Sequence, residues 1–225
     1  MDHPIHVKIC GITGAEDARA AAEAGADALG LVFAPSPRQV DLRQIPIVAE
    51  AAPGVELVGV FVAEPLESIK AAVSAGVRGV QLHRRPETIW SERDVSEFHE
   101  LAAEYRLRLI AAVSAESSDA LRADLPSRLD GAHQCLLDAF VTGQEGGTGK
   151  AFDWGLVEIA KSFGKPVIVA GGLTPDNVAT CIRQAKPWGV DVCSGVEQRP
   201  GVKDHAEIRR FLQAAHSAAE DTWVW

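Results

Sequence analysis

Short apolar runs alternate along the chain with segments whose apolar residues recur every three or four positions. Apolar runs of four to eight residues that stop at glycine or polar residues are typical of buried strands in a parallel sheet. Eight such runs predict strands, at residues 6–10, 28–33, 56–62, 77–83, 107–113, 133–138, 166–170 and 189–193.

The segments between these runs have the spacing of amphipathic helices. Three of them place their apolar residues on one predicted face: Leu66, Ile69 and Val73; Val178, Cys181, Ile182 and Ala185; and Ile208, Phe211, Leu212 and Ala215. Near the N-terminus, Thr13 and Glu16 have the spacing of a capping box, and Gly25 can end the helix that follows. The segment 117–124 is short and polar, and we expect Pro126 to stop it.

The number of strand–helix units indicates the fold. Eight units in 225 residues predict an α/β protein with a closed (β/α)8 barrel, a fold of about 250 residues. We expect a single domain over residues 1–225, because no linker divides the chain. An open doubly wound sheet is the alternative, but no GxGxxG turn follows the first strand. A closed barrel would carry its functional residues at the carboxyl ends of the strands.

Composition narrows the kind of partner. The formal net charge of -9 at pH 7 disfavours nucleic acid or an anionic membrane surface as the main partner. The chain has no apolar run of about 18 residues, and its first residues, 1–4, do not resemble a signal peptide. The four cysteines show neither CxxC pairs nor a metal-ligand spacing with histidine. We therefore expect a cytoplasmic protein without disulfides or a bound metal.

The first and last strands predict an ion pair beneath the expected site. Lys8 and Cys10 share one face of the first strand, because side chains alternate along a strand. The last strand neighbours the first in a closed barrel and offers Asp191 to an inward-facing lysine, whose burial would otherwise be costly. The cation would favour a Cys10 thiolate and make it a usable base. Alternatively, Cys10 is a small buried apolar residue. Cys193 lies beside Cys10, and we expect this pair to be sensitive to oxidation.

Other strand ends also carry polar residues. Asp138 ends the sixth strand and shares a face with Leu136, whereas Cys135 should pack against the helices. Asp138 is either a functional acid or a cap of the following turn. Arg38 follows the second strand and suits a carboxylate bound through two N–H groups, or else lies in solvent. The glycine-rich segment 141–149 is either a loop over a ligand or a solvated linker.

Two glycine turns near the end of the chain are candidates for an anion site. Gly171-Gly172 directly follows a strand, and Thr174 and Pro175 fit the N-cap and first position of the next helix. Without Cβ atoms on these glycines, an anion can approach the backbone N–H groups. Ser194-Gly195 follows the next strand in the same way. A single turn of this kind is also explained by chain reversal alone, but two in succession favour a phosphate site.

Seven blocks of the chain, in order and at compatible spacing, closely resemble phosphoribosylanthranilate isomerase. They are Lys8-Ile9-Cys10-Gly11, Phe33 with Ser36-Pro37-Arg38, Gln81-Leu82-His83, Leu137-Asp138, Gly146-Gly147-Thr148-Gly149 with Phe152-Asp153-Trp154, Ala170-Gly171-Gly172-Leu173, and Ser194-Gly195-Val196-Glu197. The resemblance runs from Lys8 to about Phe211. Each block is common, but the set is specific.

The resemblance implies an Amadori rearrangement in tryptophan biosynthesis, without cofactor or metal. N-(5-phosphoribosyl)anthranilate would become 1-(2-carboxyphenylamino)-1-deoxyribulose 5-phosphate. The resemblance assigns Asp138 as the general acid that protonates the ribose ring oxygen and Cys10 as the general base that takes the proton from C2′. It also implies that the substrate is bound by Arg38 at the anthranilate carboxylate, by His83 at the rim, and by the backbone of Gly171, Gly172, Ser194 and Gly195 at the phosphate.

The chain departs from the family pattern in several places. Arg84-Arg85-Pro86 replaces the usual Gly-Asp/Asn-Glu after His83, and Ala111 stands where a lysine or arginine is frequent. Gln39 occupies a common aromatic position in a shortened loop, and Cys193 replaces a common serine. These departures leave the proposed acid and base in place and bear on rate and substrate breadth.

Two other functions remain open. A bifunctional sugar isomerase of histidine and tryptophan biosynthesis would use an acidic residue where Cys10 stands. A non-catalytic barrel that binds a phosphorylated ligand would not need Cys10, Asp138 and Arg38 together. The sequence leaves the oligomeric state, monomer or homodimer, undecided.

Overall fold

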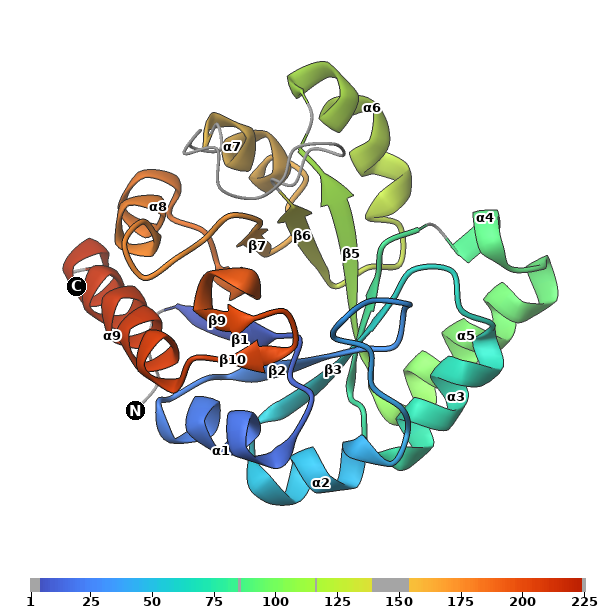
Figure 1. Ribbon diagram of the computed structural model, residues 1–225. Coiled ribbons are helices and arrows are strands. Elements are labelled where there is room, and N and C mark those ends of the chain that lie inside the picture. The colour runs from blue at the N-terminus through green and yellow to red at the C-terminus, as the bar shows by residue number, and fades with distance from the viewer. Residues whose placement is uncertain (1–4, 85, 116, 139–153, 224–225) are drawn as a thin grey trace.

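Eight parallel strands close into a barrel in which each strand is hydrogen-bonded to its neighbours in chain order (Figure 1). The computed structural model describes residues 5–84, 86–115, 117–138 and 154–223. The barrel strands are β1 His6–Cys10, β2 Ala28–Val32, β3 Glu56–Phe61, β4 Gly79–Leu82, β5 Arg108–Ser114, β6 Gln134–Asp138, β7 Val167–Ala170 and β8 Gly189–Val192. The predicted (β/α)8 barrel is confirmed, and the open sheet is excluded.

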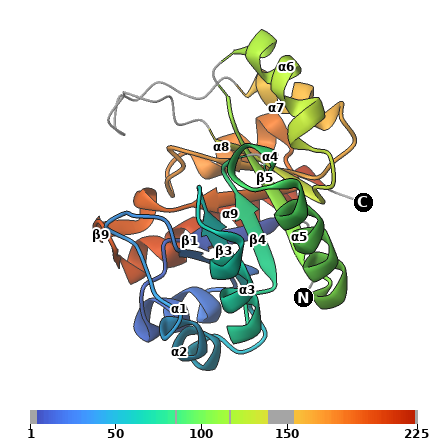
Figure 2. The ribbon, with the colours of Figure 1, turned by 90° about the vertical axis from the view of Figure 1, so that its right-hand side faces the viewer.

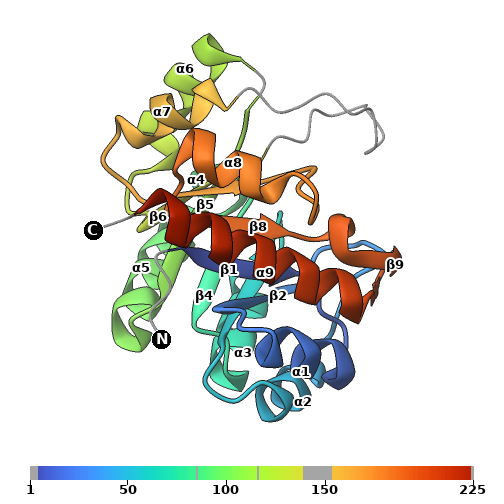
Figure 3. The ribbon, with the colours of Figure 1, turned by 90° about the vertical axis from the view of Figure 1, so that its left-hand side faces the viewer.

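Helices surround the barrel on its outside (Figures 1 and 2). They are α1 Ala15–Glu23, α2 Gln44–Ala51, α3 Leu66–Ala75, α4 Pro86–Ile89, α5 Glu92–Tyr105, α6 Ser118–Arg128, α7 Gly155–Lys161, α8 Val178–Ala185 and α9 His205–Thr222. The last helix, α9, lies beside α8 on the flank formed by β1 and β8 (Figure 3). Between β8 and α9 the chain forms a 3-10 turn, η1 Ser194–Val196, and a small hairpin of β9 Glu197–Arg199 and β10 Val202–Lys203.

The core has two layers, because side chains alternate along each strand. A small cluster fills the barrel interior and consists of Ala28, Val58, Ile110, Ala112, Leu136, Ile168 and Ala170. A much larger cluster lies between the strands and the helices. Leu136 belongs to the inner layer and Cys135 to the outer one, so the predicted faces of β6 are confirmed. Asp138, two residues after Leu136, therefore continues the inner face at the end of β6.

The predicted strands agree with the structure to within one or two residues at either end. The apolar helix faces are also confirmed, since Ile69 and Val73 on α3, Cys181 on α8, and Ile208 and Phe211 on α9 are fully buried. Gly25 has a φ of 95° just after α1, which is the left-handed conformation expected of a helix-ending glycine.

Two predicted helix starts are wrong in detail. Gly14, rather than Thr13, is the N-cap of α1 and has no side-chain cap; the Thr13 hydroxyl instead donates 3.0 Å to the carbonyl of Gly201. In the second case α8 begins at Val178, after a turn in which the Asn177 side chain accepts from the backbone N–H of Thr174 at 2.8 Å. At α1 a contact with a residue far away in the chain replaces the predicted N-cap. At α8 a contact with a residue three positions later replaces it.

The expected stop at Pro126 is also wrong, because α6 continues through it to Arg128. A proline ring removes one backbone donor and crowds the preceding turn. Leu125 before the proline and Leu129 after it are both buried, and the Leu129 N–H donates to the Leu125 carbonyl at 2.9 Å across the proline. Their burial stabilises the helix beyond the proline, and the Ser117 hydroxyl caps its start by accepting from the N–H of Ala120 at 3.2 Å.

Within the described ranges, none of the helices has the length and apolar character needed to cross a membrane. The segment 141–149, for which a ligand-covering loop was one expectation, lies outside the described residues, as do Phe152 and Asp153.

Candidate active site

The base of the site is a buried ion pair between the first and last strands. Lys8 Nζ donates to Asp191 Oδ1 at 2.9 Å, and the two residues are only 0% and 7% exposed. They occupy the same register position on β1 and β8. The predicted Lys8–Asp191 pair is therefore confirmed, and closure of the barrel is what brings its two members together.

Cys10 lies one layer above this pair, at the carboxyl end of β1. Its pKa is lowered to about 7, first by a hydrogen bond with the Cys193 thiol and then by the positive charge of Lys8, against the opposing effect of burial. The pKa of Cys193 is raised, chiefly by the same hydrogen bond and by burial. Cys193 is therefore the thiol that donates, and Cys10 is the member of the pair that ionises.

Asp138 lies at the carboxyl end of β6, half-buried, on the strand face that continues from Leu136. It is in register with Ser114 on β5 and Ala170 on β7. Its backbone carbonyl accepts from the N–H of Ala115 at 2.9 Å, which fixes the main chain at this point. Asp138 and Cys10 therefore stand on the same rim of the barrel, on different strands.

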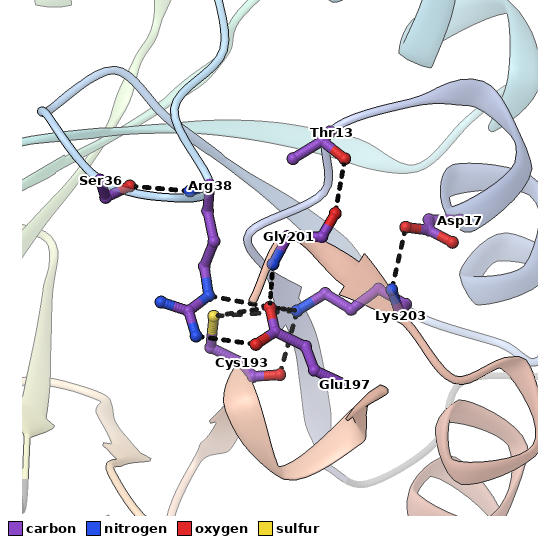
Figure 4. Close-up of polar contacts among 8 residues, drawn as sticks. All are labelled: Thr13, Asp17, Ser36, Arg38, Cys193, Glu197, Gly201 and Lys203. Carbon is purple, nitrogen blue, oxygen red and sulfur yellow. Dashed lines mark hydrogen bonds and ion pairs between the residues drawn. The ribbon is translucent and has the colours of Figure 1, made fainter. Parts of the chain in front are cut away.

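Arg38 is held above the same rim by a carboxylate from the other end of the chain (Figure 4). Its Nε and Nη2 donate to the two oxygens of Glu197 at 2.8 and 2.7 Å. The Arg38 backbone N–H also donates to the Ser36 hydroxyl at 3.1 Å. A guanidinium has five N–H donors, and Figure 4 shows its third nitrogen pointing away from Glu197. Among the described residues, Glu197 therefore fixes two nitrogens of the Arg38 guanidinium, and the third can bind a ligand carboxylate.

The buried carboxylate of Glu197 also accepts hydrogen bonds from other residues. Lys203 Nζ lies 3.1 Å and the Gly201 N–H 3.3 Å from Oε1, and the Glu197 side chain is only 4% exposed. Burial alone would raise the pKa of Glu197, but the hydrogen bond from Arg38 and the charge of Lys203 lower it below the ordinary value. Lys203 also donates to the Cys193 carbonyl at 3.0 Å. The cluster ties the loop after β2 to the end of β8.

The two glycine turns come together as predicted. Gly171 and Gly172 have φ angles of 83° and 64°, which glycine adopts without strain. Gly195 packs so closely on the first turn that a Cβ there would lie 1.9 Å from the carbonyl oxygen of Leu173. Among the residues that the structure describes, a Cβ on Gly172 would meet nothing within 4 Å. The turns thus form one backbone surface that opens to solvent at Gly172, next to Ser194-Gly195.

His83 directly follows β4 and is neutral at physiological pH. Burial, followed by the positive charges of Lys8 and Arg128, lowers its pKa to about 4. Its Nε2 lies 3.0 Å from the amide nitrogen of Gln81, a residue buried in the barrel. Because the Gln81 amide nitrogen donates to Nε2, the neutral imidazole carries its proton on Nδ1, and it offers a substrate anion an N–H donor but no charge. Within the described part of the chain, no cluster of metal-ligating side chains is found.

The sequence pattern indicates no role for Glu197 or Lys203. Glu197 belongs to the block Ser194-Gly195-Val196-Glu197, but its partner Arg38 is 159 residues away in the chain. A fully buried lysine in a two-residue strand leaves no periodic pattern to recognise. Only the approach of the hairpin β9–β10 to the loop after β2 brings these charges together.

A comparison with models of known families matches residues 7–214 to N-(5'phosphoribosyl)anthranilate (PRA) isomerase. Among individual proteins, N-(5'-phosphoribosyl)anthranilate isomerase of Pseudomonas fluorescens (strain SBW25) is 42% identical over 222 residues, which cover 96% of this chain and 97% of the relative.

Solved structures give the same result. A structure of the dimeric phosphoribosylanthranilate isomerase of Thermotoga maritima, in a form with mutually generated monomers, matches with a TM-score of 0.76 and 35% identity over 95% of this chain and 99% of that one. A phosphoribosyl anthranilate isomerase in complex with reduced 1-(o-carboxyphenylamino)-1-deoxyribulose 5-phosphate matches with a TM-score of 0.76 and 34% identity, over 95% and 99% of the two chains.

Proposed function

Since the chain belongs to the N-(5'-phosphoribosyl)anthranilate isomerase family, we propose the roles that its own residues take in this isomerisation. The reaction is a step of tryptophan biosynthesis, an Amadori rearrangement of N-(5-phosphoribosyl)anthranilate to 1-(2-carboxyphenylamino)-1-deoxyribulose 5-phosphate. One proton must reach the ribose ring oxygen, and one must leave C2′. General acid and base catalysis therefore accounts for the reaction without a cofactor.

Asp138 is the general acid in this proposal. Its carboxyl group protonates the ribose ring oxygen, so that the ring opens and the anthranilate nitrogen shares the positive charge as an iminium. Its place at the end of β6, on the face that lines the barrel interior, supports this role because active sites of such barrels lie at the carboxyl ends of the strands.

Cys10 is the general base and takes the proton from C2′ of the iminium. The observation that carries the assignment is the place of Cys10, which is hydrogen-bonded to the Cys193 thiol and lies one layer above Lys8, whose Nζ is 2.9 Å from Asp191 Oδ1. A base of pKa about 7 is matched to neutral pH, where it is both ionised and able to hold the proton it takes. Loss of the C2′ proton gives an enolamine, which becomes the ketone of the product.

Arg38 binds the anthranilate carboxylate through the donors that Glu197 does not use. Glu197 acts through Arg38 and is a positioning residue, since its two oxygens hold the guanidinium at 2.7 and 2.8 Å. The substrate phosphate binds to the backbone of Gly171, Gly172, Ser194 and Gly195, where two turns pack together. His83 contacts the substrate at the rim as a neutral side chain.

All residues in these roles come from one chain, so each barrel carries a complete site. We infer that the protein acts in the cytoplasm as a monomer or a homodimer, the second being the state named for the Thermotoga maritima relative. Its partner is the phosphorylated sugar–anthranilate substrate, and no nucleic acid or membrane is involved.

The test is turnover of freshly prepared N-(5-phosphoribosyl)anthranilate, followed by the loss of anthranilate fluorescence. Turnover by the wild type without added metal or cofactor supports the proposal. Tight binding of the reduced product without turnover would instead support the non-catalytic barrel, and the segment Arg84-Arg85-Pro86 would then be the first to exchange. Turnover of a histidine-pathway sugar phosphate would support the bifunctional isomerase.

A further inference from the structure

The proposed base, Cys10, has a second thiol beside it, Cys193, which lowers the pKa of Cys10 but takes no part in the proposed proton transfers. Strands β1 and β8 are paired at Lys8 with Asp191 and at Ile9 with Val192. Cys10 is the next residue of β1, and Cys193 is the residue that directly follows β8. Neighbouring strands lie about 4.8 Å apart, which is within the range of about 4.4–6.8 Å between the Cα atoms of a disulfide.

The two side chains also point to the same side of the sheet. Cys10 shares its face with Lys8, and Cys193 follows Asp191 in the same way, and these two faces already meet in an ion pair. A Cβ on Gly11 would lie 2.9 Å from the sulfur of Cys193, so this thiol lies directly against the residue after Cys10. Because Gly11 has no side chain, that residue does not come between the sulfurs of Cys10 and Cys193.

The pair combines an attacking and a resolving thiol. The thiolate of Cys10 is the form that reacts with peroxide. Cys193 is half-buried, and its pKa is raised chiefly by the hydrogen bond to Cys10 and by burial, so the Cys10 thiolate itself helps to keep Cys193 protonated. The other two cysteines differ, because burial raises the pKa of Cys135 and of Cys181 to about 12. Among the four cysteines, Cys10 and Cys193 are therefore the pair in which the two thiols lie close together and one of them forms a reactive thiolate.

We propose that hydrogen peroxide joins Cys10 and Cys193 in a reversible disulfide that stops the isomerase. The Cys10 thiolate attacks the peroxide, the O–O bond breaks, and a sulfenic acid and hydroxide form. The Cys193 thiol then gives its proton to the departing hydroxyl, which leaves as water, while the Cys193 sulfur forms the S–S bond with the Cys10 sulfur. In sum, two thiols lose two hydrogens and one peroxide becomes two waters. A dithiol reductant reverses the change.

The inhibition rests on the proposed role of Cys10 as base, whereas the cross-link does not. The experiment therefore reads the two separately on the same samples. The wild type, Cys193→Ser, Cys193→Ala and the control Cys181→Ser are treated with hydrogen peroxide and then with dithiothreitol. Intact mass and peptide mapping report the cross-link, and each rate is compared with that of the same variant before treatment.

In the wild type and in Cys181→Ser we expect a peptide that joins Cys10 to Cys193, and a loss of activity of about a hundredfold, as for removal of a general base. Dithiothreitol restores both. In the two Cys193 variants no such peptide forms, and oxidation of Cys10 proceeds to the sulfinic acid, which dithiothreitol does not reverse.

Oxidised wild type without the Cys10–Cys193 peptide would overturn the proposal. Inactivation that dithiothreitol reverses equally well in the Cys193 variants would also overturn it, because no resolving thiol would be needed. A complete cross-link with undiminished activity would overturn both the switch and the assignment of Cys10 as base. An enzyme inactive before treatment that still forms the cross-link would contradict the proposed function alone.

Discussion

Lys8 Nζ and the Asp191 carboxylate lie 2.9 Å apart in the interior of the barrel, one layer below Cys10. Neither charge would be tolerated there alone, because burial of an unpaired ion costs several kcal/mol. The two residues are 183 positions apart in the chain and meet only because β8 pairs with β1. The ion pair therefore joins β1 to β8, the two strands that close the barrel, directly below the proposed base.

Removal of one partner should destabilise the fold. We expect Lys8→Met to lower the free energy of unfolding by about 3–5 kcal/mol, since the Asp191 carboxylate is left buried and unpaired. Urea unfolding measures this change. The double variant Lys8→Met with Asp191→Leu should recover most of the loss, because an apolar pair of similar volume replaces the ions. A loss in Lys8→Met below about 1 kcal/mol, the size typical of an exposed pair, would contradict this account.

The pH dependence of kcat/KM should report the ionisation of Cys10. The base works as the thiolate, so activity rises with pH through the Cys10 pKa of about 7. The groups that act on this thiol are Cys193, Lys8, Asp191 and Lys203. Cys193→Ala removes the largest cause of the lowered pKa and should move the rising limb to higher pH. Cys193→Ser keeps a donor and should move it less. A limb that stays in place in Cys193→Ala would show that the thiol contact does not set the pKa.

Glu197→Gln should weaken substrate binding more than it slows the chemical step. The amide no longer offers two acceptors to Arg38, so the guanidinium loses its fixed orientation toward the anthranilate carboxylate. A charged hydrogen bond is worth about 1.5–3 kcal/mol, which corresponds to a rise in KM of about ten- to a hundredfold. Steady-state kinetics give KM and kcat for this variant and for Glu207→Gln, a control that breaks an exposed pair with Arg210.

A structural role for Glu197 alone would give a different result. If Glu197 acts through Arg38, it should add little to the effect of Arg38→Ala in the double variant. Glu197→Gln should also reduce the preference for the reduced product over the same compound without its carboxylate. Equal losses of affinity for both compounds, with additive effects in the double variant, would contradict a positioning role.

Gly195→Ala should impair phosphate binding. The added Cβ would lie 1.9 Å from the carbonyl oxygen of Leu173, so the two turns must separate. We expect the inhibition constant of inorganic phosphate to rise about tenfold or more, equivalent to about 1.4 kcal/mol. Gly14→Ala is the matched control, since its Cβ would meet no atom of the described residues within 4 Å. An unchanged constant in Gly195→Ala would place the phosphate elsewhere.

The sequence was sufficient to predict the features that follow from the alternation of side chains along a strand and from the closure of the barrel. Strand positions, the inward face of Leu136 and the pairing of Lys8 with Asp191 all follow from a period of two and from the contact of the last strand with the first. The two glycine turns could be paired in the same way, because they end neighbouring strands β7 and β8.

Features that depend on irregular tertiary contacts could not be predicted. The Thr13 hydroxyl binds the Gly201 carbonyl rather than capping its own helix, and α6 passes Pro126 because buried leucines hold it. The approach of Glu197 to Arg38 depends on the path of a hairpin after the barrel has closed. No local pattern in the sequence encodes any of these contacts.

The central claim is that Cys10 and Asp138 divide the proton transfers between them. Its most direct test is the turnover of N-(5-phosphoribosyl)anthranilate by the wild type, Cys10→Ala and Asp138→Asn. The control is Cys135→Ala, which removes a buried thiol from the outer face of β6. We predict that kcat falls by about 10²–10⁴-fold in each of the first two variants and remains close to the wild-type value in the control. Folded Cys10→Ala or Asp138→Asn enzyme that turns over the substrate within a few fold of the wild type would contradict the claim.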